Sequence, residues 1–185
     1  METIVQLNSN AKLSEHFTLG ELTKSGSHPE VYNIPSHEAI ANLKRLCSWL
    51  EVLRERYNDR YVVVKRDVST TLDMTTPSLS SRPSVARGEI SEEPIRINSG
   101  YRSPQLNKKI GGVPTSNHLT GCAVDIRVLG MEQLIRYAAI LLDYADESKQ
   151  EFDELLIEKN RYGAIWLHFA VRPRDNRRKI AFINA

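Results

Sequence analysis

Hydrophobic residues recur at helical spacing in two long stretches of the chain, 36–57 and 131–145. The first stretch begins at Ser36, a residue type that caps helices, and each stretch carries a single apolar stripe. Both therefore predict helices with one buried face, and Trp49 falls off the first stripe or at its edge. The stripes contain Ile40, Leu43, Cys47, Leu50 and Leu53 in the first stretch and Leu134, Ile135, Ala138, Leu141 and Leu142 in the second.

Two shorter helices are predicted by their capping residues. Thr18 followed by Glu21 has the spacing of a capping box. Ser103 and Pro104 supply a cap and a first helical position. The second of these helices should end at the glycine pair 111–112, since glycine is a common C-terminal stop.

Short apolar runs between these helices predict β-strands. Helices come first and strands cluster late, which predicts an α+β fold: an antiparallel sheet of about four or more strands with helices packed on it. We expect the last strand to pair with the one before it. The expected strands are 61–64, 95–97, 123–128, 152–158, 165–171 and 179–183.

The stretch 66–94 has a different composition from the rest, because Ser, Thr, Pro and Gly make up about half of it. It is expected to be a flexible insertion or a long hairpin loop. A lid over a cleft and a plain surface loop both fit, and the loop is favoured. Around this insertion, 185 residues with 41% hydrophobic content predict one domain over 1–185.

Charge and cysteine content exclude some classes of function. A net charge of +2 gives no argument for a nucleic-acid partner, and two cysteines without a disulfide pattern predict free thiols. The N-terminus lacks a basic and then apolar leader, so no signal peptide is expected. No apolar run approaches a membrane span. A product made in the cytoplasm is therefore expected. A monomer is also expected.

Candidate chemistry lies in three residues. A loop that turns at Gly121 can deliver His118, and the strand after it can deliver Asp125. His168 lies inside a hydrophobic run. Singly, each has an ordinary explanation: a surface histidine, a turn aspartate, a hydrogen-bonded core histidine. Together they form a His, Asp, His set that leaves the fourth position of a tetrahedral zinc open for water, as in catalytic sites.

The order of motifs around these residues resembles a known family. Ser-x-His-x-x-Gly-x-Ala-x-Asp ends at Asp125, and Trp-x-His ends at His168. This order is similar to the zinc D-Ala-D-Ala carboxypeptidases and the related phage endolysin peptidases, in the wider group that includes the Hedgehog signalling domain. Further similar motifs, in the family's order, are 17–22, 97–104, Leu106-Asn107, 111–113 and the tail 172–178.

The resemblance implies a Hedgehog-like, DD-peptidase-like fold with Zn²⁺ on His118, Asp125 and His168. It implies a zinc-dependent peptidase that hydrolyses D-Ala-containing bonds of peptidoglycan stem peptides, acting at the cell wall. Phage lysis and host wall remodelling are both open, and the expected lack of a signal peptide favours the phage type. The alternatives are a non-catalytic zinc-containing binding module and a cytoplasmic D-Ala-D-Ala dipeptidase.

One position departs from the family pattern. The resembling enzymes often carry a catalytic carboxylate three residues before the second histidine, where this chain has Ile165. Glu158 is the favoured general base, with Glu154 and Asp153 as fallbacks. Glu158 and His168 lie on the same face of the sheet only if the numbers of directly paired residues on their two strands add up to an even number. A pair between Glu158 and Trp166 would meet this condition.

Three further residues are site candidates by the same resemblance. Arg102 has a family counterpart that reaches towards the scissile carbonyl, where a guanidinium stabilises an oxyanion; bracing the turn before Pro104 is the alternative. Ser116 and Tyr101 are candidates for substrate binding, although Ser116 could instead shape the loop. The basic tail 172–179 fits either attraction to an anionic wall or a solvated face.

Overall fold

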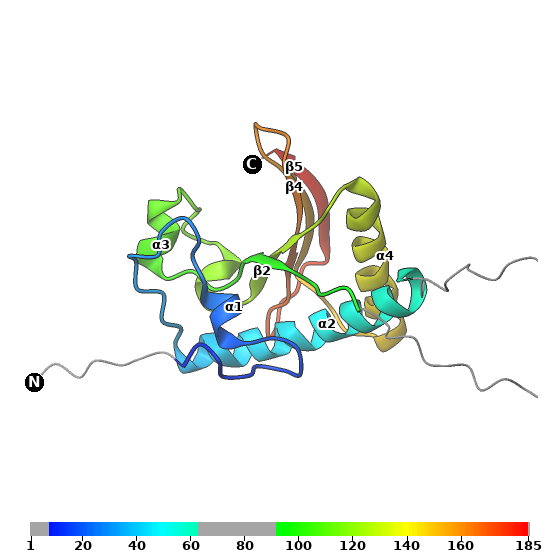
Figure 1. Ribbon diagram of the computed structural model, residues 1–185, viewed down its shortest axis with the longest axis horizontal. Coiled ribbons are helices and arrows are strands. Elements are labelled where there is room, and N and C mark those ends of the chain that lie inside the picture. Colours follow the sequence, from blue (N-terminus) through cyan, green and yellow to red (C-terminus); the bar gives the residue numbers. More distant parts are fainter. Residues whose placement is uncertain (1–7, 63–91, 185) are drawn as a thin grey trace, which may run out of the picture.

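A five-stranded sheet forms the centre of the computed structural model, which describes residues 8–62 and 92–184 (Figure 1). Most of the stretch 66–94 lies outside the described residues, so the predicted insertion is not tested. The strand order is β1-β2-β4-β3-β5. The strands are β1 (Ile97–Ser99), β2 (Ala123–Arg127), β3 (Glu154–Lys159), β4 (Ile165–Ala170) and β5 (Lys179–Asn184).

The predicted helices are present, and the long ones extend beyond their predicted ends. Ser36 caps α2 (His37–Tyr61) by accepting from the Ala39 N–H. Gly130 precedes α4 (Met131–Ser148). The Thr18 capping box begins α1 (Leu19–Thr23), and Ser103 caps α3 (Pro104–Lys109). A short 3₁₀ helix, η1 (Asn117–Thr120), lies between α3 and β2.

One face of the sheet packs against α2 and α4 and forms the core. The inward residues of the central strands are fully buried, among them Val124 and Phe169. Trp49 is 1% exposed. Its ring centroid lies 5.3 Å from that of Phe169 and 4.8 Å from that of Tyr144. Its assignment to the edge of the stripe was wrong, because α2 buries a broad face between the sheet and α4.

The last strand pairs differently from the expectation. β5 runs parallel to β3, whereas pairing with β4 was expected. The cause lies at the start of β3, where the Arg178 N–H donates to the Phe152 carbonyl and the Lys179 N–H to that of Asp153. The returning chain therefore joins the outer side of β3 and continues in the same direction. The sheet is mixed and mostly antiparallel, within the predicted α+β class.

Two smaller differences concern strand ends. Tyr61 is the last residue of α2, so it does not begin a strand, and residues 63–64 lie outside the described part. The strand predicted at 95–97 begins at Ile97 and continues to Ser99. In the described residues, no helix combines the length and apolar character that a membrane crossing requires.

Register places polar side chains on the sheet face opposite the helices. Asp125 is the cross-strand partner of His168 in the β2–β4 pair. Glu158 is the partner of Trp166 in the β3–β4 pair. Because side chains two residues apart share a face, Glu158 and His168 lie on the same side of the sheet. The even-sum condition on the register is met.

Candidate metal centre

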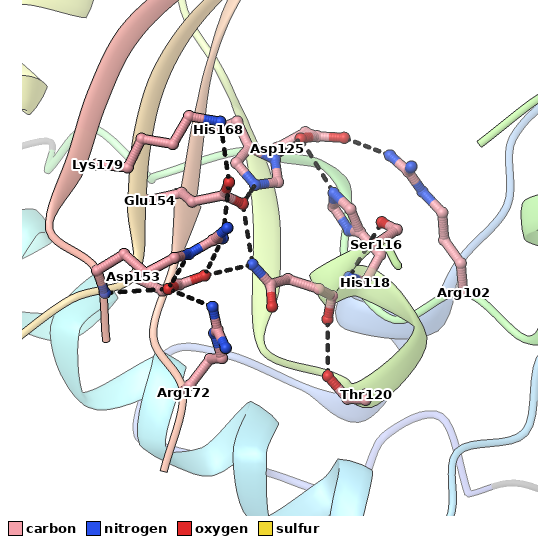
Figure 2. Close-up of polar contacts among 12 residues, drawn as sticks. Arg102, Ser116, His118, Thr120, Asp125, Asp153, Glu154, His168, Arg172 and Lys179 are labelled. Carbon is pink, nitrogen blue, oxygen red and sulfur yellow. Dashed lines mark hydrogen bonds and ion pairs between the residues drawn. The ribbon is translucent and has the colours of Figure 1, made fainter. Parts of the chain in front are cut away.

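The three predicted ligands lie together and are buried. One ligand atom from each of His118, Asp125 and His168 lies within 4.8 Å of the others. The residues are 2%, 6% and 7% exposed, respectively. They come from η1, β2 and β4, so the group joins the loop to the two central strands (Figure 2).

Local backbone geometry sets the position of His118. Ser116 caps η1 by accepting from the His118 N–H at 3.3 Å. The helix ends at Gly121, which has a φ of +72°. A Cβ at Gly121 would lie 2.5 Å from the carbonyl oxygen of Ala39 in α2. Glycine is therefore required here both by the left-handed backbone and by the close approach to α2.

Each imidazole has one nitrogen directed at Asp125 and the other at an oxygen acceptor. His118 Nε2 lies 3.3 Å from Asp125 Oδ1, while its Nδ1 lies 2.6 Å from the Gly100 carbonyl oxygen. His168 Nδ1 lies 2.9 Å from the same Oδ1, and its Nε2 lies 3.6 Å from Glu154 Oε2. Outer oxygen partners of this kind orient metal-binding histidines. Two ring nitrogens and a carboxylate oxygen thus converge as a donor set that fits a divalent metal.

Electrostatics keep the carboxylate charged. Burial alone would raise the pKa of Asp125, but His118 and His168 hold it below the ordinary value. Burial alone would lower the pKa of His168, but Asp125 and Glu154 raise it to about 9. Without a metal, His168 therefore carries a proton on both ring nitrogens near neutral pH, and metal binding must displace one of them.

Arg102 contacts the carboxylate of Asp125, one of the candidate ligands. Its Nη2 lies 2.5 Å from Asp125 Oδ2, the oxygen directed away from the histidines, and its Nε donates to Ser99 Oγ at 2.8 Å. Its Nη1 makes no hydrogen bond to another described residue. Arg102 therefore fixes the rotamer of Asp125 and retains one free edge of the guanidinium.

Glu158 lies on the metal face of the sheet, diagonal to His168. It is half-buried, and this burial raises its pKa above the ordinary glutamate value. Beside it, Trp166 Nε1 is buried without a hydrogen-bond partner in the described residues. Glu158 is thus a carboxylate without a close ion pair among the described residues.

The two fallback carboxylates have other partners. Asp153 is 0% exposed, and Arg172, Arg177 and Asn117 all donate to it at 2.7 Å. These donors outweigh the effect of burial and hold its pKa well below the ordinary range. Glu154 contacts His168, and its pKa is lowered to about 2. Both carboxylates are engaged in ion pairs and are poor proton acceptors at neutral pH.

Sequence reasoning missed this ion cluster. Arg172 and Arg177 belong to the basic tail, yet they bind an internal carboxylate. Arg174 in the same tail is solvent-exposed. The available signal was Asp153 beside Phe152 at the start of an apolar strand, because a buried carboxylate requires donors. Which donors it uses depends on the path of residues 172–178.

The two substrate-binding candidates have structural contacts. The Ser116 hydroxyl caps η1 next to His118, as the loop-shaping alternative expects. Tyr101 is buried in the core, and its backbone N–H donates to the Leu22 carbonyl at 2.7 Å.

Comparison with known proteins adds a family match. Residues 63–146 match a family model described as Peptidase M15. The matched stretch contains His118 and Asp125, and it ends before His168. No curated protein matches the chain.

Proposed function

We propose that this chain, which belongs to the Peptidase M15 family, is a zinc-dependent peptidase that hydrolyses D-Ala-containing bonds of peptidoglycan stem peptides. One observation carries the proposal: a buried His, Asp, His group whose ligand atoms lie within 4.8 Å of one another. The family is zinc-dependent, and the donor set fits zinc in number and type. A bound zinc supplies a water of lowered pKa and polarises the scissile carbonyl.

Glu158 is the proposed general base. Peptide hydrolysis needs a group that takes a proton from the attacking water and delivers it to the leaving amine. Ile165 cannot do this, while Asp153 and Glu154 are engaged by cations. Glu158 faces the metal side of the sheet, and its raised pKa suits a proton carrier.

Arg102 is proposed to have two roles, one at Asp125 and one at the substrate. Its Nη2 orients Asp125, and its free Nη1 edge is available for the oxygen of the scissile carbonyl as negative charge develops there. Tyr101 and Ser116 are proposed to contact substrate ends beside this group. Their support is the resemblance of the motifs that contain them.

The substrate assignment rests on the same resemblance. Stem peptides of peptidoglycan, and D-alanine at the cleaved bond, come from the enzymes whose motifs this chain shares. We therefore place the action at the cell wall, in phage lysis or in wall remodelling. A monomer without a nucleic-acid partner remains our expectation.

The rival from another class is a non-catalytic zinc-containing binding module. Ile165, in place of the acid three residues before His168, is the feature that favours it. A cytoplasmic D-Ala-D-Ala dipeptidase is the enzyme alternative. The three alternatives predict cleavage of different substrates, or of none, so one assay separates them.

The test measures new amino termini after incubation of the purified protein with three substrates. These are peptidoglycan, a synthetic stem pentapeptide ending in D-Ala-D-Ala, and the free dipeptide. We expect cleavage of peptidoglycan or the pentapeptide, its loss with a chelator, and its return with zinc. Cleavage of the free dipeptide alone would indicate the dipeptidase. Zinc binding without cleavage of any substrate would indicate the binding module.

A further inference from the structure

We infer that Glu154 is a positioning residue of the metal centre, which holds the proton of His168 on Nε2 and so leaves Nδ1 free to bind metal. The inference deepens the proposed function, because it rests on the metal centre of that proposal. Glu154 begins β3, and its side chain lies on the metal face beside His168 (Figure 2).

The Glu154 carboxylate is fixed from both sides. Oε1 faces cations, with Arg177 Nη2 at 2.9 Å and Lys179 Nζ at 3.4 Å. Oε2 accepts from Asn117 Nδ2 at 2.9 Å and lies 3.6 Å from His168 Nε2. The side chain is 14% exposed. A carboxylate held in this way presents its second oxygen to His168 without freedom to rotate.

This arrangement selects one tautomer of His168. At 3.6 Å the contact of Glu154 Oε2 with His168 Nε2 is an ion-pair contact and not a hydrogen bond, and a negative carboxylate there favours the ring form with its hydrogen on Nε2. The lone pair of that form is on Nδ1, which lies 2.9 Å from Asp125 Oδ1. At His118 the ring nitrogen that faces away from Asp125 is Nδ1, and its partner is the uncharged carbonyl of Gly100. Glu154 is the charged member of this pair of outer acceptors, and a charged acceptor makes its histidine a stronger ligand.

Asn117 connects Glu154 to the buried carboxylate of Asp153. Its Nδ2 donates to Asp153 at 2.7 Å and to Glu154 at 2.9 Å, and the next residue in the chain is His118. Loss of the Glu154 charge should therefore act on His168 directly. Loss of the tail contacts at Asp153 should act on folding.

The experiment compares zinc affinity in Glu154→Gln and in the unmodified protein by competition with a chromophoric chelator. Glu154→Gln keeps the shape and removes the charge beside His168 Nε2. We expect zinc binding to weaken by roughly 10- to 100-fold, the range for loss of such outer partners. The visible absorption bands of the cobalt-substituted protein should also shift, because the field of the His168 ligand changes.

Two controls separate positioning from folding. Glu151→Gln makes the same change at an exposed carboxylate whose contact is Arg178 at 3.7 Å, and should leave affinity and spectrum unchanged. Lys179→Met removes a partner of Glu154 without touching His168, and should change affinity by less than Glu154→Gln does. If Glu154→Gln does not fold, Glu154→Asp retains the charge, withdraws it from His168, and should weaken zinc binding as well.

Zinc affinity within twofold of the unmodified value in folded Glu154→Gln would overturn the inference. So would an unchanged cobalt spectrum. An unmodified protein that binds no zinc would reject the metal centre and the proposed function together. An unmodified protein that binds zinc but cleaves nothing would reject the peptidase proposal alone, and the affinity comparison would still decide the role of Glu154.

Discussion

The two histidines of the candidate metal centre direct different ring nitrogens at Asp125. His118 directs Nε2 at Asp125, and His168 directs Nδ1. The difference follows from their elements, because His118 approaches from a 3₁₀ turn and His168 from the strand adjacent to Asp125. Nδ1 is the ring nitrogen nearer to the backbone of its own residue. It can therefore reach Asp125, whose backbone lies directly across the strand pair from that of His168. The site therefore depends on strand register at His168 and on a glycine-stopped turn at His118.

His168→Ala should abolish most zinc binding. The substitution removes one of three ligands and leaves Asp125 with a single imidazole partner. Metal content after purification without added metal should fall from near one zinc per chain to a small fraction. His28→Ala, at a histidine outside the centre, should keep full occupancy. Unchanged zinc in His168→Ala would identify His168 as a core residue.

Glu158→Gln should retain zinc and lose turnover by roughly 100-fold or more, the scale of general acid–base catalysis. The amide keeps the shape and cannot take a proton from water. In the unmodified enzyme, burial raises the pKa of Glu158, and a base must be deprotonated to act. The rate should therefore fall as the pH decreases through a value above that of an ordinary glutamate. Steady-state rates across pH, with zinc content measured on the same samples, test both points.

Full activity in Glu158→Gln would exclude Glu158 as the base. Glu151→Gln, the same change at an exposed site, is the matched control and should keep the activity. Loss of zinc together with activity would show that Glu158 supports the metal centre and would leave the proton carrier to be sought elsewhere.

At the scale of elements, the segment between β4 and β5 is attached to the start of β3 through Asp153. Arg172 and Arg177 both donate to this buried carboxylate, and backbone hydrogen bonds follow at Arg178 and Lys179. The attachment determines that β5 adds to the sheet beside β3. The same carboxylate reaches η1 through Asn117.

Asp153→Asn should destabilise the fold by about 3–5 kcal/mol, the usual effect of removing one partner from a buried ion pair. The structure lowers the pKa of Asp153 below the ordinary value of 3.8, so its stabilisation is fully present above that value. This stabilisation is lost as the pH falls further. Urea unfolding at several pH values should show the difference between Asp153→Asn and the unmodified protein shrinking in acid.

Asp175→Asn is the matched control for that comparison. Asp175 lies in the same segment and is solvent-exposed, and its one ion pair within the described part of the chain is a 3.8 Å contact with Arg174. Its φ of +56° is one that asparagine tolerates well. Equal unfolding free energies for the two variants would mean that the Asp153 cluster does not hold the segment.

Prediction from sequence succeeded where the determinant is local. Capping residues located α1, α2 and α3, and the alternation rule gave the condition that the Glu158–Trp166 register meets. It failed where the determinant is distant in the chain. The pairing of β5 and the burial of Trp49 depend on contacts across the whole domain, which no local pattern reports. His118, Asp125 and His168, which the structure brings together, could be selected from the sequence because their two motifs follow one another in the family's order. The Glu154 and Asp153 contacts could not, because they depend on the path of the tail.

At the scale of the whole molecule, the sheet separates two environments. Its helix-covered face is apolar and closed, with α2 and α4 against the central strands (Figure 1). Its other face carries Asp125, His168, Glu154 and Glu158. Two of the three candidate ligands, Asp125 and His168, lie on β2 and β4, which are neighbouring inner strands of the sheet and not its edges. A metal bound there joins η1 to both strands.

Zinc should therefore stabilise the folded protein as a whole. A ligand that binds only the native state stabilises it by about 2.7 kcal/mol at 100 times its dissociation constant. For a domain of this size, about 1 kcal/mol corresponds to about 2–4 °C in Tm, so saturating zinc should raise Tm by roughly 5–10 °C. A chelator should reverse the increase, because the ligands then lose their shared partner. His168→Ala should show little response to either reagent. A Tm of the unmodified protein that responds to neither zinc nor chelator would mean that the three side chains form a hydrogen-bonded cluster and no metal centre.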